Sequence, residues 1–187
     1  MSANLRNYVK TIYALDAVVQ RTPTEAWDKQ SPCDAWTARE VLGHFMWGAQ
    51  RLTAAASGDA TPPEKAEAEV AGTDPKSNWA VTRDALLAAL DHQGALDRHF
   101  DGPFGPGRID DFLGIHTTDG LLHAWDIAKT AGIDSHIPED LAAACAAGLA
   151  SFGDGIRRPG LFDAAVAVPE SADPVTKFVA IAGRNPL

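Results

Sequence analysis

The feature that most constrains this chain is an apolar segment, residues 112–126, that also carries ionisable side chains. A helix turns by about 100° per residue, so one face of a helix here would present Phe112, His116, Asp119, His123 and Ile127. Burying a carboxylate and two imidazoles on such a face is costly unless each finds a partner. The segment therefore predicts a buried polar site, either a metal centre or a network of hydrogen bonds among these side chains and the backbone.

The spacing of the aspartate and the second histidine favours the metal centre. Asp119 and His123 are four residues apart, so both side chains can reach one point above a helix. His44 lies beside Val41 and Gly48 on the apolar side of an earlier predicted helix and could complete the set. Two imidazoles and a carboxylate are ligands typical of a catalytic zinc centre, which leaves one position open for water or substrate. The HExxH pattern of metalloproteases is absent, so peptide hydrolysis gains no support.

Two further residues on the same segment are candidates for catalytic roles. His116, one turn before Asp119, is a candidate fourth ligand or proton shuttle; the alternative is a pocket-lining histidine bonded to a neighbouring side chain. Asp126 is placed to accept a hydrogen bond from a ligand imidazole or to orient a polar substrate. For Asp126 the alternative is an ion pair with an arginine such as Arg39.

The tryptophans and cysteines give weaker signals. Trp47, one turn after His44, is a candidate for the wall of a cofactor pocket. We expect plain core packing for Trp36, Trp79 and Trp125. Cys33 and Cys145 lack metal-site spacing and are expected to be small buried apolar residues in a reducing compartment.

Apolar residues recur at helical spacing over most of the chain and predict an all-α fold. We expect long helices over residues 5–19, from the Thr37 cap to Ser57, from Asp74 toward Phe100, and over residues 109–131. The glycine and proline cluster at 102–107 would end the third of these. Residues 59–72 read as a solvated loop with room for a short helix or a lid.

The last third of the chain is less regular. Pro138 opens a fifth helix, and a strand candidate at 162–168 and a short helix at 174–182 follow. The helix at 109–131 is apolar on more than one side, which indicates a central helix or a subunit contact, and a homodimer is inferred from this excess. Four long helices joined by polar loops favour a helical bundle, which commonly builds metal sites from facing helices.

Length and charge exclude several classes of partner. A chain of 187 residues with 45% hydrophobic content can bury one core, and we expect a single domain over residues 1–187. A formal charge of -9 repels phosphate backbones and anionic membranes, so neither nucleic acid nor membrane is expected as a partner. The N-terminus lacks the charged-then-apolar order of a signal peptide, and a cytoplasmic location is the expectation.

Two sequence blocks carry a family resemblance. The blocks are Ser31-Pro-Cys-Asp-Ala-Trp-Thr-Ala-Arg-Glu-Val-Leu-Gly-His44 and Leu121-Leu-His-Ala-Trp-Asp-Ile-Ala-Lys-Thr-Ala-Gly132. They resemble the mycothiol-dependent maleylpyruvate isomerase N-terminal, DinB-like family of metal-binding proteins. Two tail segments, Phe162-Asp-Ala-Ala-Val-Ala-Val-Pro and Phe178-Val-Ala-Ile-Ala-Gly-Arg-Asn-Pro186, are similar to the ending of a largely uncharacterised actinobacterial subgroup. The resemblance implies a DinB-like four-helix bundle, an additional helix and a short irregular C-terminal segment.

The resemblance also implies a site and a cofactor. It places a divalent metal, usually zinc, on His44, Asp119 and His123, with Asp126 in a position associated with activity. Asp119 stands where the isomerase has glutamate, and the isomerase's separate C-terminal domain is not expected here. By this analogy the function is that of a mycothiol-dependent transferase or isomerase, whose partners are a small-molecule thiol and an electrophilic substrate. The alternative is a non-catalytic metal-binding or small-molecule-sequestering bundle.

Overall fold

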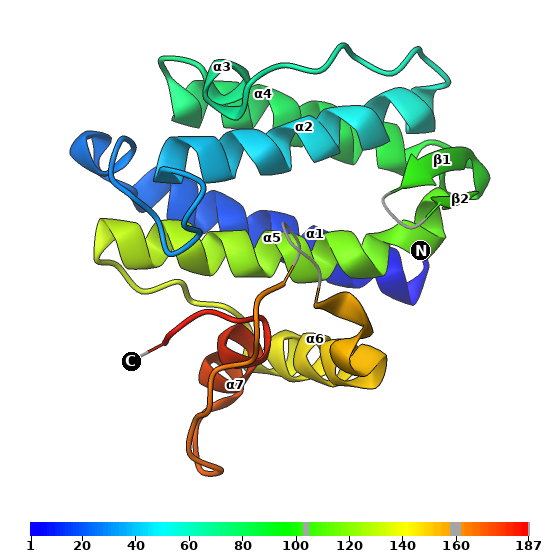
Figure 1. The fold of residues 1–187 in the computed structure, drawn as a ribbon. Coiled ribbons are helices and arrows are strands. Elements are labelled where there is room, and N and C mark those ends of the chain that lie inside the picture. Colours follow the sequence, from blue (N-terminus) through cyan, green and yellow to red (C-terminus); the bar gives the residue numbers. More distant parts are fainter. Residues whose placement is uncertain (103–104, 158–161, 187) are drawn as a thin grey trace.

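Helices dominate the computed structural model, which describes residues 1–102, 105–157 and 162–186. Within these residues the four longest helices are α1 (Ala3–Arg21), α2 (Ala38–Ser57), α4 (Pro75–Asp91) and α5 (Ile109–Ala131). They lie side by side and pack around one apolar core (Figure 1). The predicted all-α fold is confirmed.

Residues that the sequence marks as caps set the ends of α2 and α5. The Thr37 hydroxyl accepts a hydrogen bond from the Glu40 N–H, and the Glu40 carboxylate accepts one from the Thr37 N–H, so a capping box starts α2. Both helices end at glycines, Gly58 and Gly132, with φ of 80° and 66°. Other residues rarely adopt this left-handed backbone, which stops the helix there. The predicted ends of α2 and α5 are confirmed.

Short elements connect the long helices. They are η1 (Thr24–Ala26), α3 (Glu67–Ala71), η2 (Ala95–Asp97) and the antiparallel strands β1 (His99–Gly102) and β2 (Gly105–Arg108). The helix α3 forms in the segment predicted as a loop with room for a short helix. It lies so close to α2 that a Cβ on Gly43 would collide with the backbone of Glu67. Gly43 therefore lets α3 cover α2 next to His44.

The third predicted helix is wrong at its C-terminal end. The helix α4 stops at Asp91, and Gly94 follows with φ of 80°, so the chain leaves the helical path well before Phe100. Phe100 is buried from strand β1, with its ring 5.2 Å from that of Phe112. Phe100 is apolar because it packs in the core from a strand, and it does not continue the helical pattern of α4. Of the glycine and proline cluster, residues 103–104 lie outside the described residues.

The C-terminal part adds α6 (Glu139–Phe152), η3 (Gly153–Ile156) and α7 (Pro174–Ile181). The helices predicted to open at Pro138 and to cover 174–182 are confirmed. The strand candidate at 162–168 is wrong, because this segment finds no strand to pair with among the described residues and most of its side chains are exposed. Its Val166 N–H instead donates to the Ala180 carbonyl, which ties the segment to α7.

Two apolar clusters share the helix α5. One lies among α1, α2, α4 and α5, and the other among α5, α6 and α7, on the opposite side of α5 (Figure 1). Leu121 and Leu122 belong to the second cluster and are 0% and 2% exposed, and Trp125 packs against it. The apolar excess of α5 is thus covered within one chain, so it no longer argues for a homodimer. None of the described helices combines the length and apolarity needed to cross a membrane.

Candidate metal centre

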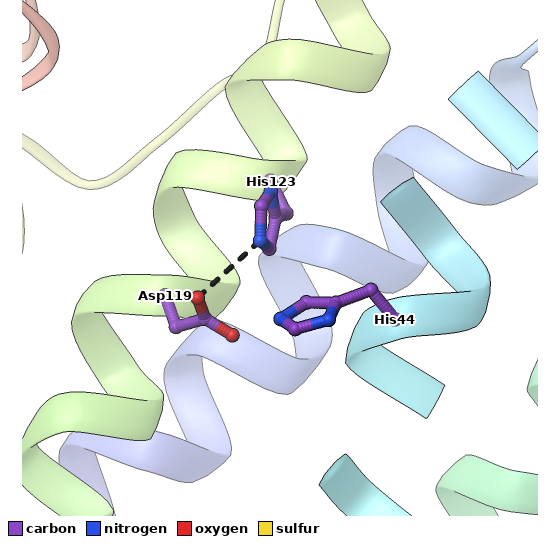
Figure 2. Close-up of side chains that lie close together, drawn as sticks. All are labelled: His44, Asp119 and His123. Carbon is purple, nitrogen blue, oxygen red and sulfur yellow. Dashed lines mark ion pairs between the residues drawn. The ribbon is translucent and has the colours of Figure 1, made fainter. Parts of the chain in front are cut away.

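The three predicted ligands meet at the interface of α2 and α5. Asp119 and His123 lie one turn apart on α5, and His44 faces them from α2 (Figure 2). One ligand atom from each residue can be chosen so that all three lie within 4.8 Å of one another. Nitrogen and oxygen ligands about 2.0–2.1 Å from a zinc ion in tetrahedral geometry lie roughly 3.4 Å apart, so small side-chain movements would bring these three atoms onto one cation. The arrangement is therefore a candidate site for a divalent cation, with nitrogen and oxygen donors of the kind that zinc takes.

His123 is held from both sides by carboxylates. Its Nε2 lies 3.3 Å from Asp119 Oδ1, and its Nδ1 lies 3.1 Å from Asp126 Oδ2. Burial by itself lowers the pKa of His123, but Asp119 and Asp126 outweigh burial and raise it to about 9. Burial likewise opposes the Asp119 carboxylate, yet the three nearby histidines hold its pKa well below the usual range. Without a cation the two residues are an imidazolium–carboxylate pair, and a bound cation would take the place of the shared proton.

His44 is prepared to act as a neutral donor. Burial is the main cause that lowers its pKa, so the imidazole is uncharged near neutral pH. Trp36 stacks on this ring with centroids 4.5 Å apart and an interplanar angle of 27°. The same indole meets the edge of His123 at 6.1 Å. Trp36 is half-buried and packs against the apolar core, as predicted, but it also contacts two of the three candidate ligands.

The centre is open to solvent on the Asp119 side. The Asp119 side chain keeps 33% of its surface exposed, against 4% for His123. A structural metal site normally encloses all of its ligands, whereas a catalytic site leaves one position accessible. The exposure of Asp119 therefore matches the open type of centre.

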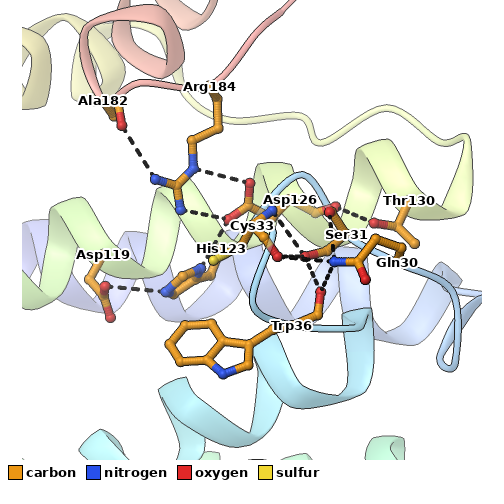
Figure 3. A network of polar contacts seen from close by, with 10 residues as sticks. All are labelled: Gln30, Ser31, Cys33, Trp36, Asp119, His123, Asp126, Thr130, Ala182 and Arg184. Carbon is orange, nitrogen blue, oxygen red and sulfur yellow. Dashed lines mark hydrogen bonds and ion pairs between the residues drawn. The ribbon is translucent and has the colours of Figure 1, made fainter. Parts of the chain in front are cut away.

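Asp126 is the carboxylate that contacts His123 on the side away from Asp119. It is fully buried, accepts a hydrogen bond from His123 Nδ1, and pairs with Arg184 at 3.2 and 3.4 Å (Figure 3). The predicted contact with a ligand imidazole and the alternative ion pair are both present. The arginine is Arg184 from the C-terminal tail, however, while Arg39 pairs with Asp28.

His116 lies apart from the three ligands. It does not join the cluster of ligand atoms, and its ring packs between Tyr8 and Phe100 at centroid distances of 6.2 and 5.9 Å. Burial lowers the pKa of His116 to about 4, so its imidazole is neutral. Its Nε2 is buried with no hydrogen-bond partner in the described part of the chain, and the same holds for the Tyr8 hydroxyl and for Trp47 Nε1. Tyr8 and Phe100 contact the His116 ring, and Arg51 links the Phe100 ring to that of Trp47.

Trp47 lies one turn beyond His44 on α2. The guanidinium of Arg51 sits over its indole at 4.8 Å and over the Phe100 ring at 5.2 Å. The structure thus places Trp47 in an aromatic and cationic group beside His116. Its role toward a cofactor stays a prediction.

Sequence reasoning did not find three residues of this neighbourhood. Trp36, Tyr8 and Arg184 come from a loop, from α1 and from the tail, and no spacing relates them to the α5 motif. Trp36 does lie in one of the two blocks that carry the family resemblance, and Arg184 lies in the tail that is similar to the ending of a subgroup. Their signal was therefore the resemblance, and their roles became visible only from contacts.

The fold and the site together define a class: a helical bundle with a candidate His–Asp–His metal centre between two facing helices. Residues 10–128 match the family model of the mycothiol maleylpyruvate isomerase N-terminal domain. This is well over half of the chain, so the chain belongs to that family.

Relatives and solved structures agree with this assignment. The uncharacterised proteins Rv0738 and MT0763 of Mycobacterium tuberculosis are each 30% identical over 159 residues, covering 83% of this chain and 83% of theirs. Crystal structures of mycothiol-dependent maleylpyruvate isomerase, as a histidine-to-alanine mutant and without that mutation, superpose with TM-scores of 0.60 and 0.54 at 16% identity. Each match covers 78% of this chain and 68% of the isomerase. At this identity the match shows a shared fold.

Proposed function

We propose that this chain binds a divalent cation, zinc, through His44, Asp119 and His123, and acts with a low-molecular-weight thiol, mycothiol, as a transferase or isomerase on a small electrophilic molecule. The thiol and the reaction class rest on the family. The cation rests on the observation that carries the proposal, which is the convergence of three ligand atoms within 4.8 Å between α2 and α5.

A bound divalent cation would act as a Lewis acid that lowers the pKa of a thiol and holds its thiolate. The residues of the chain would supply the surroundings. His44 and His123 offer neutral nitrogen donors once His123 has lost its proton, and Trp36 excludes water from the His44 side. Asp126 holds the His123 ring so that Nε2 faces the cation. The exposed edge of Asp119 marks the side from which a ligand enters.

His116 and Trp47 would serve the substrate side. His116 is neutral near pH 7, so Nε2 can accept or donate one hydrogen bond and pass a proton to or from a bound molecule. Buried polar atoms without partners are uncommon in folded proteins. A ligand beside Tyr8, Trp47 and His116 would satisfy them, which supports placing the substrate there.

The non-catalytic alternative makes a different structural demand. A closed centre with His116 as the fourth ligand would favour it. The cluster of ligand atoms leaves His116 out, and a third of the Asp119 side-chain surface stays accessible. Both observations support the open centre and therefore the enzyme.

Zinc titration of the purified metal-free chain tests the proposal. We expect one equivalent of zinc to bind, and His44→Ala, Asp119→Asn and His123→Ala each to weaken binding by at least about 100-fold, because each removes a ligand. His92→Ala is the matched control, since His92 is an exposed histidine outside the site. Mycothiol added to the zinc-loaded chain should form thiolate, measured by ultraviolet absorbance.

Two results would contradict the proposal at different levels. Elemental analysis without stoichiometric metal after zinc loading would remove the centre. Thiol binding that is unaffected by removal of the metal would leave the centre in place but refute the thiol-dependent enzyme.

A further inference from the structure

Arg184 is a buried cation that reaches the centre from outside the family domain. The family model ends its match at residue 128, and Arg184 lies in the tail after α7. It is only 8% exposed, although arginine is rarely buried without a paired partner. Two hydrogen bonds hold this residue in place. Its backbone N–H donates to the Val179 carbonyl, and its side-chain Nη1 donates to the Ala182 carbonyl at 3.3 Å.

The partner of Arg184 is the carboxylate that holds the ligand histidine. Nε donates to Asp126 Oδ1 at 3.4 Å and Nη2 donates to Oδ2 at 3.2 Å, so the guanidinium spans both oxygens. Oδ2 is also the atom that faces His123 Nδ1 at 3.1 Å. Figure 3 shows the resulting chain of contacts from the tail, through Asp126, to His123 and Asp119.

This arrangement leaves Asp126 little freedom to turn. A carboxylate bonded only to His123 could rotate about its side-chain bonds, whereas two donors from a rigid guanidinium fix its plane. With Oδ2 fixed, His123 must keep its proton on Nδ1 and direct Nε2 toward Asp119 and His44.

We propose that Arg184 is a positioning residue of the metal centre, which fixes Asp126 and through it orients His123 for the cation. The inference rests on the metal centre of the proposed function. It adds that the centre is completed by the tail of the chain, outside the part that matches the family.

Zinc affinity of full-length variants tests this role. Competition with a chromogenic chelator gives the affinity, and the visible spectrum of the cobalt-substituted protein reports the geometry of the ligands. We expect Arg184→Met to weaken zinc binding by about 10-fold and to alter the cobalt spectrum, as loss of an outer hydrogen-bond partner does. Arg184→Lys should fall between wild type and Arg184→Met, because an ammonium group replaces the charge but cannot span both oxygens.

A double-mutant cycle separates positioning from general stability. If Arg184 acts through Asp126, adding Arg184→Met to Asp126→Asn causes no further loss of zinc affinity. Arg83→Met is the matched control, since Arg83 also pairs with a half-buried aspartate, Asp16 at 2.7 Å, but between α4 and α1. It should leave zinc affinity unchanged even if it lowers the melting temperature.

The outcomes keep the two proposals apart. A wild-type chain that binds no zinc refutes the proposed function. A wild-type chain that binds zinc, with Arg184→Met and Arg184→Lys binding equally well, refutes the role of Arg184 alone. Additive losses in the double mutant would also overturn it, because they would show that Arg184 acts independently of Asp126.

Discussion

His116 shows what a buried imidazole without a protein partner contributes to a fold. Its pKa is lowered to about 4 by burial, from 6.5 in a solvated histidine. Between these pH values the unfolded chain binds a proton at this residue while the folded chain does not. Acidification through this range therefore favours unfolding, because stability follows the difference in bound protons.

Replacing His116 with phenylalanine should flatten the pH dependence of stability. The histidine accounts for at most about 3 kcal/mol of the loss in unfolding free energy between pH 6.5 and 4, and phenylalanine cannot take up the proton. Urea unfolding of the metal-free protein at several pH values measures this slope. His92→Phe, at an exposed position, should keep the wild-type slope. A slope unchanged by His116→Phe would show that the imidazole is not desolvated in the folded protein.

Single residues of the site differ in how far the sequence could predict them. Asp119 and His123 were found because two ionisable side chains one turn apart on an apolar helix need partners. His44 was a candidate third member because it lies on the apolar side of another predicted helix, and the family resemblance then assigned it to the same cation. Trp36 and Arg184 contact the site from a loop and from the tail. The path of these segments cannot be predicted from the spacing of apolar residues.

At the scale of elements, the close packing of α5 on its neighbours depends on Gly120, which follows the proposed ligand Asp119. A Cβ on Gly120 would lie 2.6 Å from Thr11 Cγ2 and 2.8 Å from the Phe45 ring. The close packing of α5 on α1 and α2 therefore depends on this glycine. Helix ends were predictable because caps are local, whereas the hairpin after α4 was not, since its strands are only four residues each and one contains a proline.

Gly120→Ala should weaken both the fold and zinc binding. The added methyl group has to push α5 away from α1 and α2, at a cost of about 1–3 kcal/mol, and Asp119 would move with the helix. Gly114→Ala is the control on the same helix, because a Cβ there meets nothing within 4 Å. This control should stabilise the protein by about 0.5–1 kcal/mol, since alanine is the better helix former. Thermal unfolding and the zinc titration measure both effects, and equal behaviour of the two variants would contradict the packing argument.

The whole molecule couples two apolar clusters through one shared helix. The first cluster holds His44 on α2 against α5, and the second holds the tail against the other side of α5. A cation bound between α2 and α5 would therefore stabilise the folded state as a unit, because it binds no comparable site in the unfolded chain.

Zinc should raise the melting temperature of the protein in a concentration-dependent way. At free zinc 100-fold above its dissociation constant the gain is about 2.7 kcal/mol. The chain carries a formal charge of -9, so zinc could also bind to surface carboxylates. The variant Asp119→Asn separates stabilisation by the proposed centre from stabilisation by zinc on the surface. Calorimetry should show the rise in wild type and not in this variant. An equal rise in both would place the stabilising zinc elsewhere.

Arg184 follows its partner Asp126 by 58 residues, which has a consequence for biosynthesis. A protein is made from its N-terminus, so Arg184 leaves the ribosome well after Asp126 and the three proposed ligands. Until Arg184 emerges, the Asp126 carboxylate has no guanidinium partner. A nascent chain should therefore hold a cation more weakly before Arg184 emerges than after it.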